Sequence, residues 1–398
     1  MSNPLYNRYK NATLGLEMPF LLLDKLLFDK NIEAIIHRAK GRPIRIASKS
    51  IRCNALIKSL LDQHKEFIGV MSYSALETLF LLENEIDNIL LGYPITNKEH
   101  IKLLCNKIAR GARITFMVDC IEHIRLIQEQ AKLYDIKAPI CIDIDMSSKF
   151  PFIYFGVYRS SVKGVDDLKH LINQISNFDN ISIEGIMGYE AQIAGLGDNI
   201  AGAGLMNSVI RFLKKKSIKE IAQRRKACID FLQAKGFELK IINGGGTGSI
   251  ESTFDESYIN EITVGSGFFS SHLFDNYKNF KHESALMYAI ECTRKPTDNI
   301  ITCTGGGYVA SGAVGLNKQA IPHLPQGLTL LKDEGTGEVQ TPFDISECVE
   351  NLQLGDPIFM RHSKAGEVCE RFNKIHILVD EKNILSVNTY RGNGKCFM

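Results

Sequence analysis

Short apolar runs alternate with longer segments of helical spacing along the first two-thirds of the chain. Each run is only a few residues long and almost wholly apolar, which is typical of parallel strands that are buried on both faces. We predict eight such strands, at residues 43–48, 67–71, 88–92, 113–118, 140–145, 182–188, 238–243 and 261–265. Segments with apolar residues at helical spacing fill the gaps, at residues 54–64, 75–82, 98–110, 121–133 and 206–235. The pattern therefore predicts an α/β fold.

Two α/β architectures compete for this pattern. Eight strand–helix pairs over about 250 residues fit a (β/α)8 barrel of the TIM type. An open, doubly wound sheet normally carries its glycine-rich loop after the first strand. In this chain the glycine-rich segment, residues 243–249, follows the seventh predicted strand, which is where barrels tend to hold phosphate groups. We therefore predict a barrel.

The spacing of apolar residues along the chain changes near residue 275. Helical spacing fades there, and alternating β-type stretches replace it at residues 300–304, 359–361, 376–379 and 384–389. We predict a barrel over residues 21–274 and a separate, mainly β domain over residues 275–398. Residues 1–20 are expected to add a strand to that β domain.

The composition argues against several classes of partner. The chain has 398 residues, is 44% hydrophobic and 23% charged, and carries a formal net charge of +2. This balance gives no reason to expect nucleic acid or an anionic membrane as a partner. No apolar run is long enough to span a membrane, and the first residues lack the layout of a secretory signal. Ten cysteines without CxxC spacing are typical of reduced thiols, so we expect a cytoplasmic protein without a structural zinc site.

Lys49 directly follows the first predicted strand. A lysine at the C-terminal end of a parallel barrel strand points into the mouth of the barrel, where active sites lie. In such a semi-enclosed site the pKa of its amine can fall, which allows Schiff-base chemistry. The alternative is a solvated lysine that begins a loop.

Two glycine-rich turns follow the seventh and eighth predicted strands. Their candidate phosphate-binding residues are Gly246, Thr247 and Gly248 in the first turn and Gly265 and Ser266 in the second. Glycine lets the backbone approach a phosphate, and the hydroxyls add donors, although each turn can also be a flexible loop. A lysine at one strand end and a phosphate cradle at two others are what an enzyme needs to hold pyridoxal 5'-phosphate.

Polar residues also end the fifth and sixth predicted strands. Asp143 and Asp145 alternate along the fifth, so both can face the barrel centre, or one can cap the next helix. Arg159 follows them, and Tyr189 ends the sixth strand. Arg159 and Tyr189 are candidates to contact the cofactor ring or its 3-hydroxyl, whereas the alternative for Tyr189 is a packed tyrosine at the rim.

A candidate metal site lies in the predicted β domain. His362, Glu367 and Cys369 fall within eight residues and are ligand types for a divalent ion. His362 and Cys369 are the candidate ligands, with zinc or manganese as the expected ion. A metal at this place would polarise a β-hydroxyl of the substrate.

The long predicted helix after the sixth strand carries a basic stretch between Arg211 and Lys226. An RNA-binding surface is one interpretation of these charges. Because no aromatic residues line the basic face, we interpret the stretch as a solvated helix on the outside of the barrel.

These motifs, in this order, resemble those of the alanine-racemase-like (fold type III) pyridoxal-phosphate enzymes, and within them the D-threonine aldolase and D-serine dehydratase group. The resemblance covers nearly the whole chain. It rests on an apolar entry strand at residues 18–24, an arginine-bearing strand before Lys49, the two glycine turns and the Tyr-Glu-X-Gln run at residues 189–192.

The chain departs from this group at two places. Ile46 and Ala47 stand where the group commonly has a Pro-His pair. The group's metal site is typically a His-X-Cys or His-X-Asp pair, whereas His362 is followed two positions later by Lys364, and Cys369 lies seven positions away. The resemblance therefore implies pyridoxal chemistry more firmly than metal-assisted aldol cleavage.

The resemblance implies a homodimeric pyridoxal-phosphate enzyme that acts on a small amino acid. It implies Lys49 as the catalytic residue and as a cofactor ligand, through a Schiff base to the aldehyde. The other implied cofactor-binding residues are Arg159, Tyr189, Gly246, Thr247, Gly248, Gly265 and Ser266. We expect aldol cleavage or β-elimination with deamination of a β-hydroxy amino acid, the D configuration being the first expectation. Three alternatives stay open: an amino-acid racemase of the same fold, a non-catalytic pyridoxal-phosphate carrier and a cofactor-free Schiff-base aldolase.

Overall fold

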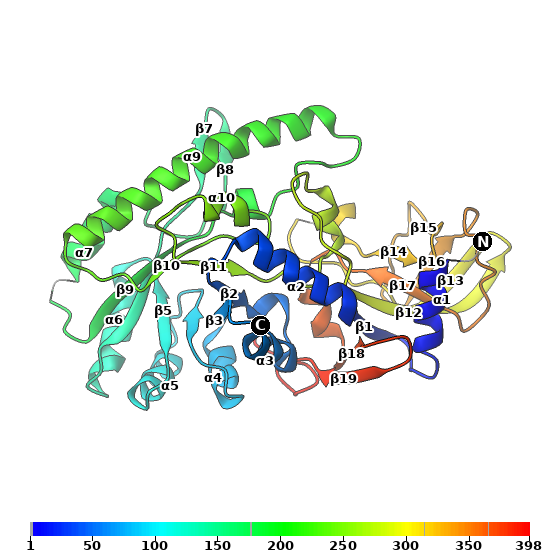
Figure 1. Ribbon diagram of the computed structural model, residues 1–398, viewed down its shortest axis with the longest axis horizontal. Coiled ribbons are helices and arrows are strands. Elements are labelled where there is room, and N and C mark those ends of the chain that lie inside the picture. Colours follow the sequence, from blue (N-terminus) through cyan, green and yellow to red (C-terminus); the bar gives the residue numbers. More distant parts are fainter. Residues whose placement is uncertain (1–2, 176, 314, 365) are drawn as a thin grey trace.

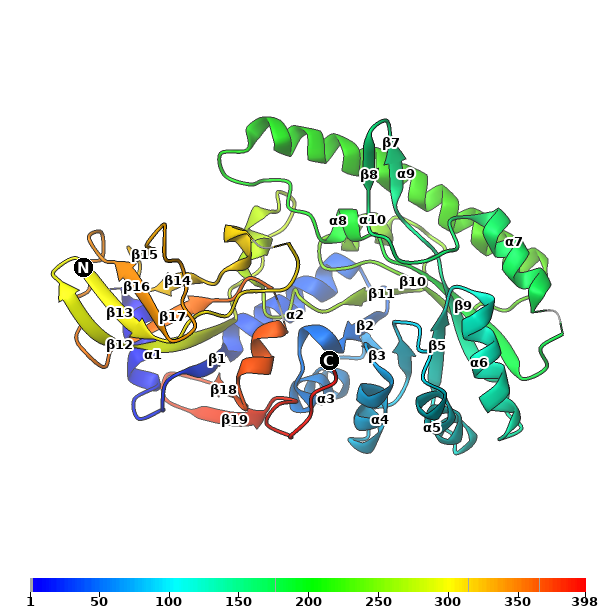
Figure 2. The same cartoon turned by 180° about the vertical axis from the view of Figure 1, so that it is seen from behind.

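The computed structural model describes residues 3–175, 177–313, 315–364 and 366–398. A helix-wrapped barrel forms one end of the elongated molecule and a β-rich region forms the other (Figure 1). The C-terminal end of the chain lies between these two parts when the molecule is seen from behind (Figure 2).

Eight parallel strands close into a barrel in the order β10-β11-β2-β3-β4-β5-β6-β9, which confirms the predicted fold class. The strands are β2 (Ile44–Ala47), β3 (Phe67–Ser72), β4 (Ile89–Leu91), β5 (Ile114–Val118), β6 (Ala138–Asp143), β9 (Ile181–Gly188), β10 (Ile241–Gly244) and β11 (Glu261–Val264). The barrel closes where Ile262 of β11 pairs with Ile44 of β2. Each strand falls within three residues of a predicted one, because most residues of these strands are buried and apolar.

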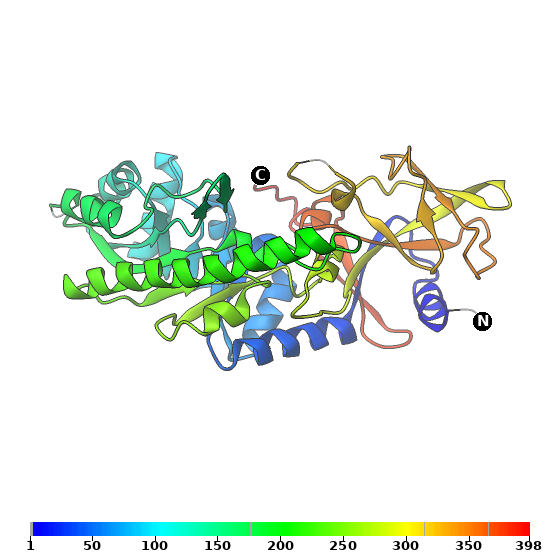
Figure 3. The same ribbon diagram turned by 90° about the horizontal axis from the view of Figure 1, so that it is seen from above.

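Helices of the barrel region cover its outer face. They are α2 (Lys25–Ala39), α3 (Asn54–Gln63), α4 (Ala75–Glu83), α5 (Lys98–Ala109), α6 (Ile121–Lys132), α7 (Val165–Gln174), α8 (Ala191–Ala194), α9 (Gly204–Ala234) and α10 (Ile250–Phe254). In α6 the buried residues Ile121, Ile124, Ile127 and Ala131 lie three or four positions apart, which places them on the face toward the barrel. The 31-residue helix α9 runs along the length of the barrel region (Figure 3).

The second part is a nine-stranded sheet. Its strands are β1 (Phe20–Asp24), β12 (Leu286–Thr297), β13 (Ile300–Thr304), β14 (Ile321–Leu324), β15 (Thr329–Leu330), β16 (Gln340–Asp344), β17 (Pro357–Arg361), β18 (Lys374–Leu378) and β19 (Ile384–Asn388). Strand β1 lies between β12, to which it is antiparallel, and β18, to which it is parallel. The first strand of the chain is thereby tied to segments more than 260 residues away.

The N-terminal segment differs from the expectation of a strand within residues 1–20. A helix, α1 (Pro4–Ala12), occupies most of it, and the strand that joins the sheet is β1. Asn3 caps α1, because its side chain accepts hydrogen bonds from the amides of Leu5 and Tyr6. Tyr6 and Tyr9 then pack edge-on against Phe359 of the sheet, so α1 covers the β region.

A hairpin of β7 (Ser148–Phe150) and β8 (Ile153–Phe155) projects between β6 and α7 and had no counterpart among the predicted elements. Four short 3-10 turns complete the chain: η1 (Ser48–Ser50), η2 (His272–Asn276), η3 (Leu316–Lys318) and η4 (Glu367–Arg371). Among the described residues, no helix has the length and apolar character needed to cross a membrane.

Candidate active site

A cavity of about 560 Å³ opens at the C-terminal ends of the barrel strands, and residues of the β domain form part of its wall. The sequence-predicted residues that line it are Lys49, Arg159, Tyr189, Gly246, Thr247, Gly265 and Ser266. Gly248 packs behind the wall instead, where an added Cβ would lie 2.4 Å from the carbonyl oxygen of Ala194. The fold thus brings the lysine and both glycine turns to one site.

Lys49 lies in η1, the single turn that directly follows β2. Ser48 anchors this turn by donating a hydrogen bond from Oγ to the carbonyl of Met71 at 3.0 Å. Arg52 Nε donates to the Lys49 carbonyl, also at 3.0 Å. From this fixed backbone the Lys49 amine reaches the hydroxyl of Tyr93, with Nζ donating to Oη at 2.6 Å.

Tyr93 is a site residue that the sequence analysis missed. Burial acts to raise the pKa of its hydroxyl, but the adjacent Lys49 ammonium and the Arg159 guanidinium outweigh burial, so the pKa lies below the ordinary tyrosine value. The sequence could have indicated this role, because Tyr93 lies two residues after Leu91, the last residue of β4. Side chains at that end of a barrel strand surround the mouth.

Arg159 stands among aromatic rings on the cavity wall. Its guanidinium carbon lies 5.0 Å from the centre of the Tyr189 ring and 6.0 Å from the centre of the Tyr93 ring, so cation–π contacts hold it in place. Burial raises the pKa of Tyr189 to about 12, so that hydroxyl keeps its proton at neutral pH. The wall therefore combines a permanent cation with hydrogen-bond donors.

The two glycine turns are tied together at the hydroxyl of Thr247. The Gly267 amide donates to Thr247 Oγ1 at 2.9 Å, and Ser266 Oγ lies 3.3 Å from the same atom. Glycine is needed where the second turn meets the lysine segment, because a Cβ on Gly265 would lie 2.8 Å from the Cβ of Ala47. Together the turns form a cradle of amide and hydroxyl groups beside Lys49.

A buried ion network supports the first glycine turn from behind. Arg225 of α9 is fully buried, donates from Nη2 to Glu190 Oε2 at 3.0 Å and also pairs with Glu256. Glu190 Oε1 accepts a hydrogen bond from Ser249 Oγ at 2.7 Å, and Ser249 Oγ in turn accepts from the Gly246 amide at 3.0 Å. A continuous chain of hydrogen bonds therefore connects α9 with the backbone of the turn.

This network changes the interpretation of the basic stretch on α9. Lys215, Lys216 and Lys226 are exposed, as expected for a solvated helix. Lys214 and Arg225, however, are buried, and Lys214 Nζ lies 3.3 Å from Asp198 Oδ2. Buried charges in α9 therefore serve ion pairs inside the molecule.

The β domain adds polar groups that the sequence analysis did not assign to the cavity. Lys364 Nζ donates to Ser311 Oγ at 2.8 Å and lies 3.0 Å from Glu367 Oε1. Lys318 lines the same cavity. No local pattern marks these residues, because only the docking of the β domain on the barrel brings them to the site.

Asp143 and Asp145 lie outside the residues that line the cavity. Asp145 is buried and accepts a hydrogen bond from the Ser147 amide at 2.7 Å, which matches the alternative of loop bonding. Burial raises the pKa of Asp143 to about 7, while Arg159 acts to lower it. Asp143 therefore lies close enough to Arg159 for the two charges to interact.

The candidate metal ligands His362 and Cys369 are both buried, but they do not share a metal-type arrangement with a third donor among the described residues. The ring nitrogens of His362 have no hydrogen-bond partner in the described part of the chain, and His362 lines a smaller cavity of about 370 Å³ beside the first. Lys364, at the position of the second ligand in the His-X-Cys pattern, is a cation. The donor set does not fit the expected metal.

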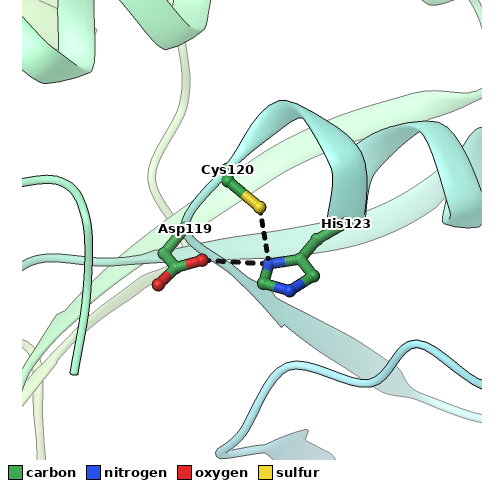
Figure 4. A group of neighbouring side chains, drawn as sticks. All are labelled: Asp119, Cys120 and His123. Carbon is green, nitrogen blue, oxygen red and sulfur yellow. Dashed lines mark hydrogen bonds and ion pairs between the residues drawn. The ribbon is translucent and has the colours of Figure 1, made fainter.

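One group of three metal-ligand side chains does occur in the described residues, at the start of α6 (Figure 4). Asp119 Oδ1 lies 3.0 Å and Cys120 Sγ 3.2 Å from His123 Nδ1. The Asp119 carbonyl also accepts from Ser161 Oγ at 2.6 Å. These contacts tie the end of β5 to the segment that carries Arg159.

No protein-family model matches the chain. Among curated proteins, a 3-hydroxy-D-aspartate aldolase of Paracoccus denitrificans (strain Pd 1222) is 24% identical over 258 residues, which is 63% of this chain. The matched part spans 60% of the length of that relative.

Solved structures are similar over nearly the whole chain. A D-threonine aldolase from Filomicrobium marinum has a TM-score of 0.78 at 18% identity, covering 94% of this chain and 95% of its own. A D-threo-3-hydroxyaspartate dehydratase from Delftia sp. HT23 has a TM-score of 0.74 at 14% identity, with coverages of 95% and 99%. An alanine racemase of Clostridium difficile 630 has a TM-score of 0.64 at 16% identity, with coverages of 94% and 98%. The chain therefore has the alanine-racemase fold, an eight-stranded parallel barrel followed by a mainly β region.

Proposed function

We propose that the protein is a pyridoxal-phosphate-dependent lyase that acts on a β-hydroxy amino acid. The observation that carries the proposal is the meeting of the Lys49 amine and the two glycine turns in one cavity at the C-terminal end of the barrel. The donor set fits the cofactor, because amide and hydroxyl groups of the turns suit a phosphate and the lysine suits an aldehyde. A volume of about 560 Å³ is in the range of small-molecule sites.

Each residue has a distinct part in this proposal. Lys49 would hold pyridoxal phosphate through the aldehyde carbon; when the substrate amine takes the place of Lys49 there, the cofactor would supply an electron sink for the bond that breaks at Cα, and the Lys49 amine would be free. Lys49 carries the proton that leaves or returns to Cα. Tyr93 orients the Lys49 amine through their 2.6 Å hydrogen bond. Thr247 and Ser266 hold the phosphate, and Arg159 provides a positive charge for the ring 3-hydroxyl.

The comparisons favour a D-configured β-hydroxy substrate and either aldol cleavage or β-elimination. The curated relative is named for the aldol reaction of 3-hydroxy-D-aspartate, and two structural neighbours are named as a D-threonine aldolase and a D-threo-3-hydroxyaspartate dehydratase. A racemase is the second candidate, because alanine racemases share the fold. The products separate these reactions: glycine with an aldehyde or an oxo acid, a 2-oxo acid with ammonia, or the enantiomer.

The visible absorption spectrum of the purified protein tests the proposal. We expect a yellow band that borohydride bleaches and that is missing from Lys49→Ala. Lys98→Ala, on the exposed face of α5, is the matched control and should keep the band. After reduction, the cofactor mass should appear on the peptide that contains Lys49. A protein that stays colourless when pyridoxal phosphate is added would contradict the cofactor assignment.

We further propose a cytoplasmic homodimer. All ten cysteines are free thiols, which suits a reducing compartment. A row of exposed apolar side chains at the start of α9 supports self-association.

A further inference from the structure

A turn of the β region, described at residues 362–364, 366 and 367, follows strand β17 and places the side chains of Lys364 and Glu367 in the wall of the cavity. The Lys364 ammonium donates to Ser311 Oγ at 2.8 Å and pairs with Glu367 at 3.0 Å. Glu367 also accepts from the Ser311 amide at 2.7 Å. These contacts fix the direction of a long side chain that would otherwise be free to move.

The same turn is in direct contact with the turn that carries the proposed cofactor lysine. Gly366 has φ +80°, and a Cβ built on it would lie 2.1 Å from the carbonyl oxygen of Lys49 and 2.7 Å from the Cα of Ser50. No side chain can occupy that space. The backbones of the Lys49 and Lys364 turns are therefore held against each other, and both lysines line one cavity.

The surroundings of Lys364 are unsuited to a divalent cation. His362 is the only histidine of the turn. The nearby carboxylates are already engaged, Asp275 by Arg361 at 2.6 Å and Glu367 by Lys364 at 3.0 Å. Cys369 does not complete a three-donor group with it among the described residues. A divalent ion at this turn would therefore have one neutral imidazole as its ligand, which is too few to hold it.

We propose that the Lys364 ammonium takes the place of the metal, donating a hydrogen bond to the oxygen on Cβ of the substrate, so that the reaction needs no divalent ion. This inference rests on the proposed function. Negative charge grows on that oxygen in aldol cleavage, as its proton passes to the free Lys49 amine, the Cα–Cβ bond breaks and Lys49 returns the proton to Cα. It also grows in β-elimination, as Lys49 takes the Cα proton, the carbon–oxygen bond breaks and the leaving oxygen departs as water with a proton from Lys364. A fixed cation stabilises that charge in either reaction.

The first experiment separates the lysine from a metal. The cofactor-loaded protein is treated with a chelator, its metal content is measured, and it is assayed with D-threonine and D-threo-3-hydroxyaspartate. We expect activity within about twofold of the untreated protein. Loss of activity that zinc, manganese or magnesium restores would overturn the proposal. A metal whose binding is lost in Cys120→Ser, with activity kept, belongs to the α6 group and leaves the proposal supported.

The second experiment measures binding by rapid mixing, in the phase that precedes turnover. Changes in the cofactor absorption give dissociation constants for D-threonine and for D-2-aminobutyrate, which lacks the β-hydroxyl. In the wild type the hydroxylated compound should bind more tightly, and Lys364→Met should reduce that preference by about 10- to 100-fold, as expected for a lost hydrogen bond from a charged group. Lys364→Arg should restore part of it.

Lys382→Met, an exposed lysine of the β domain outside both cavities, is the control and should keep the wild-type preference. A preference that is unchanged in Lys364→Met, with the cofactor band intact, would overturn the inference while leaving the proposed function standing. A protein that takes up no cofactor would instead refute the proposed function itself, so the two failures are distinct.

Discussion

Arg225 shows at the scale of one residue how the site depends on charges placed behind it. Its guanidinium is fully buried between Glu190 and Glu256. Glu190 in turn accepts a hydrogen bond from Ser249. Removing the cation leaves two carboxylates in the interior without a partner. An unpaired buried charge is far more costly than an absent pair.

We therefore expect Arg225→Met to lower the free energy of unfolding by about 3–5 kcal/mol, and to weaken pyridoxal-phosphate binding because the Gly246 turn loses its support. Urea unfolding and cofactor titration measure the two effects. Lys226→Met, next in sequence but exposed and paired only with Asp230 at the surface, should change the unfolding free energy by less than about 0.5 kcal/mol. Equal effects of the two substitutions would contradict this account.

Glu77 makes the stability of the fold depend on pH. It is fully buried, with Oε1 accepting from Tyr390 Oη at 2.8 Å and Oε2 from the Tyr73 amide at 2.7 Å. Burial raises the pKa of its carboxyl to about 7, against the lowering effect of these hydrogen bonds. Between the unfolded pKa, near 4.5, and pH 7, the folded state holds a proton that the unfolded chain has released.

The contribution of Glu77 to stability is therefore present below pH 4.5 and is lost as the pH rises to 7, by about 3 kcal/mol. We expect the difference in unfolding free energy between the wild type and Glu77→Gln to change by that amount between pH 4.5 and pH 8. The substitution should be least harmful at the higher pH. Urea unfolding at a series of pH values measures it, and a pH-independent difference would show that Glu77 titrates normally.

The site residues differ in how far sequence could predict them. Lys49 and the two glycine turns stand at the ends of apolar strands, and barrel topology alone places such ends around one mouth. Tyr93 occupies an equivalent position, but its role depends on the direction of its side chain toward Lys49. Lys364 reaches the cavity only because the β region packs against the barrel, and no local pattern in the sequence predicts that packing.

The same distinction holds for whole elements. The barrel strands were predictable because most of their residues are apolar and buried, although β2 and β11 also contain the buried ion pair of Arg45 and Glu261. The hairpin β7–β8 could not be predicted in this way. It projects from the barrel, and its tip residue Phe152 is fully exposed although it is apolar. Helix α1 carried a local signal, Asn3 as cap followed by Pro4, that the expectation of a strand within residues 1–20 did not use.

At the element scale, the contact between the Gly366 turn and the Lys49 turn is open to a direct test. Gly366→Ala combines a backbone with φ +80° and a Cβ that would lie 2.1 Å from a carbonyl oxygen. We expect the turns to separate, with at least a tenfold loss of turnover and a lower melting temperature. Gly355→Ala is the matched control, because Gly355 has φ +89° but an open surrounding. Gly355→Ala should lower the melting temperature and leave turnover unchanged. If both variants lose turnover equally, the contact between the Gly366 and Lys49 turns has no particular role in catalysis.

At the scale of the whole molecule, the start of α9 offers a surface for a second copy of the chain. Leu205, Val209 and Phe212 lie four and three residues apart, so they share one face, and they are 84%, 41% and 58% exposed. A long helix normally buries such a row, and polar residues would be expected on a face that meets only water. The row thus agrees with the homodimer that we propose.

We expect the wild type to have the mass of a dimer by size exclusion with light scattering, and the double substitution Val209→Glu and Phe212→Glu to give a monomer. Charges buried at an apolar interface carry a large desolvation cost, whereas the same charges on a solvated helix carry little. The melting temperature of the isolated variant then reports whether the fold survives as a monomer. Lys215→Glu and Lys219→Glu, on exposed positions of the same helix, form the control and should stay dimeric. A dimer that persists with glutamates at 209 and 212 would place the interface elsewhere, and a monomeric wild type would refute the dimer.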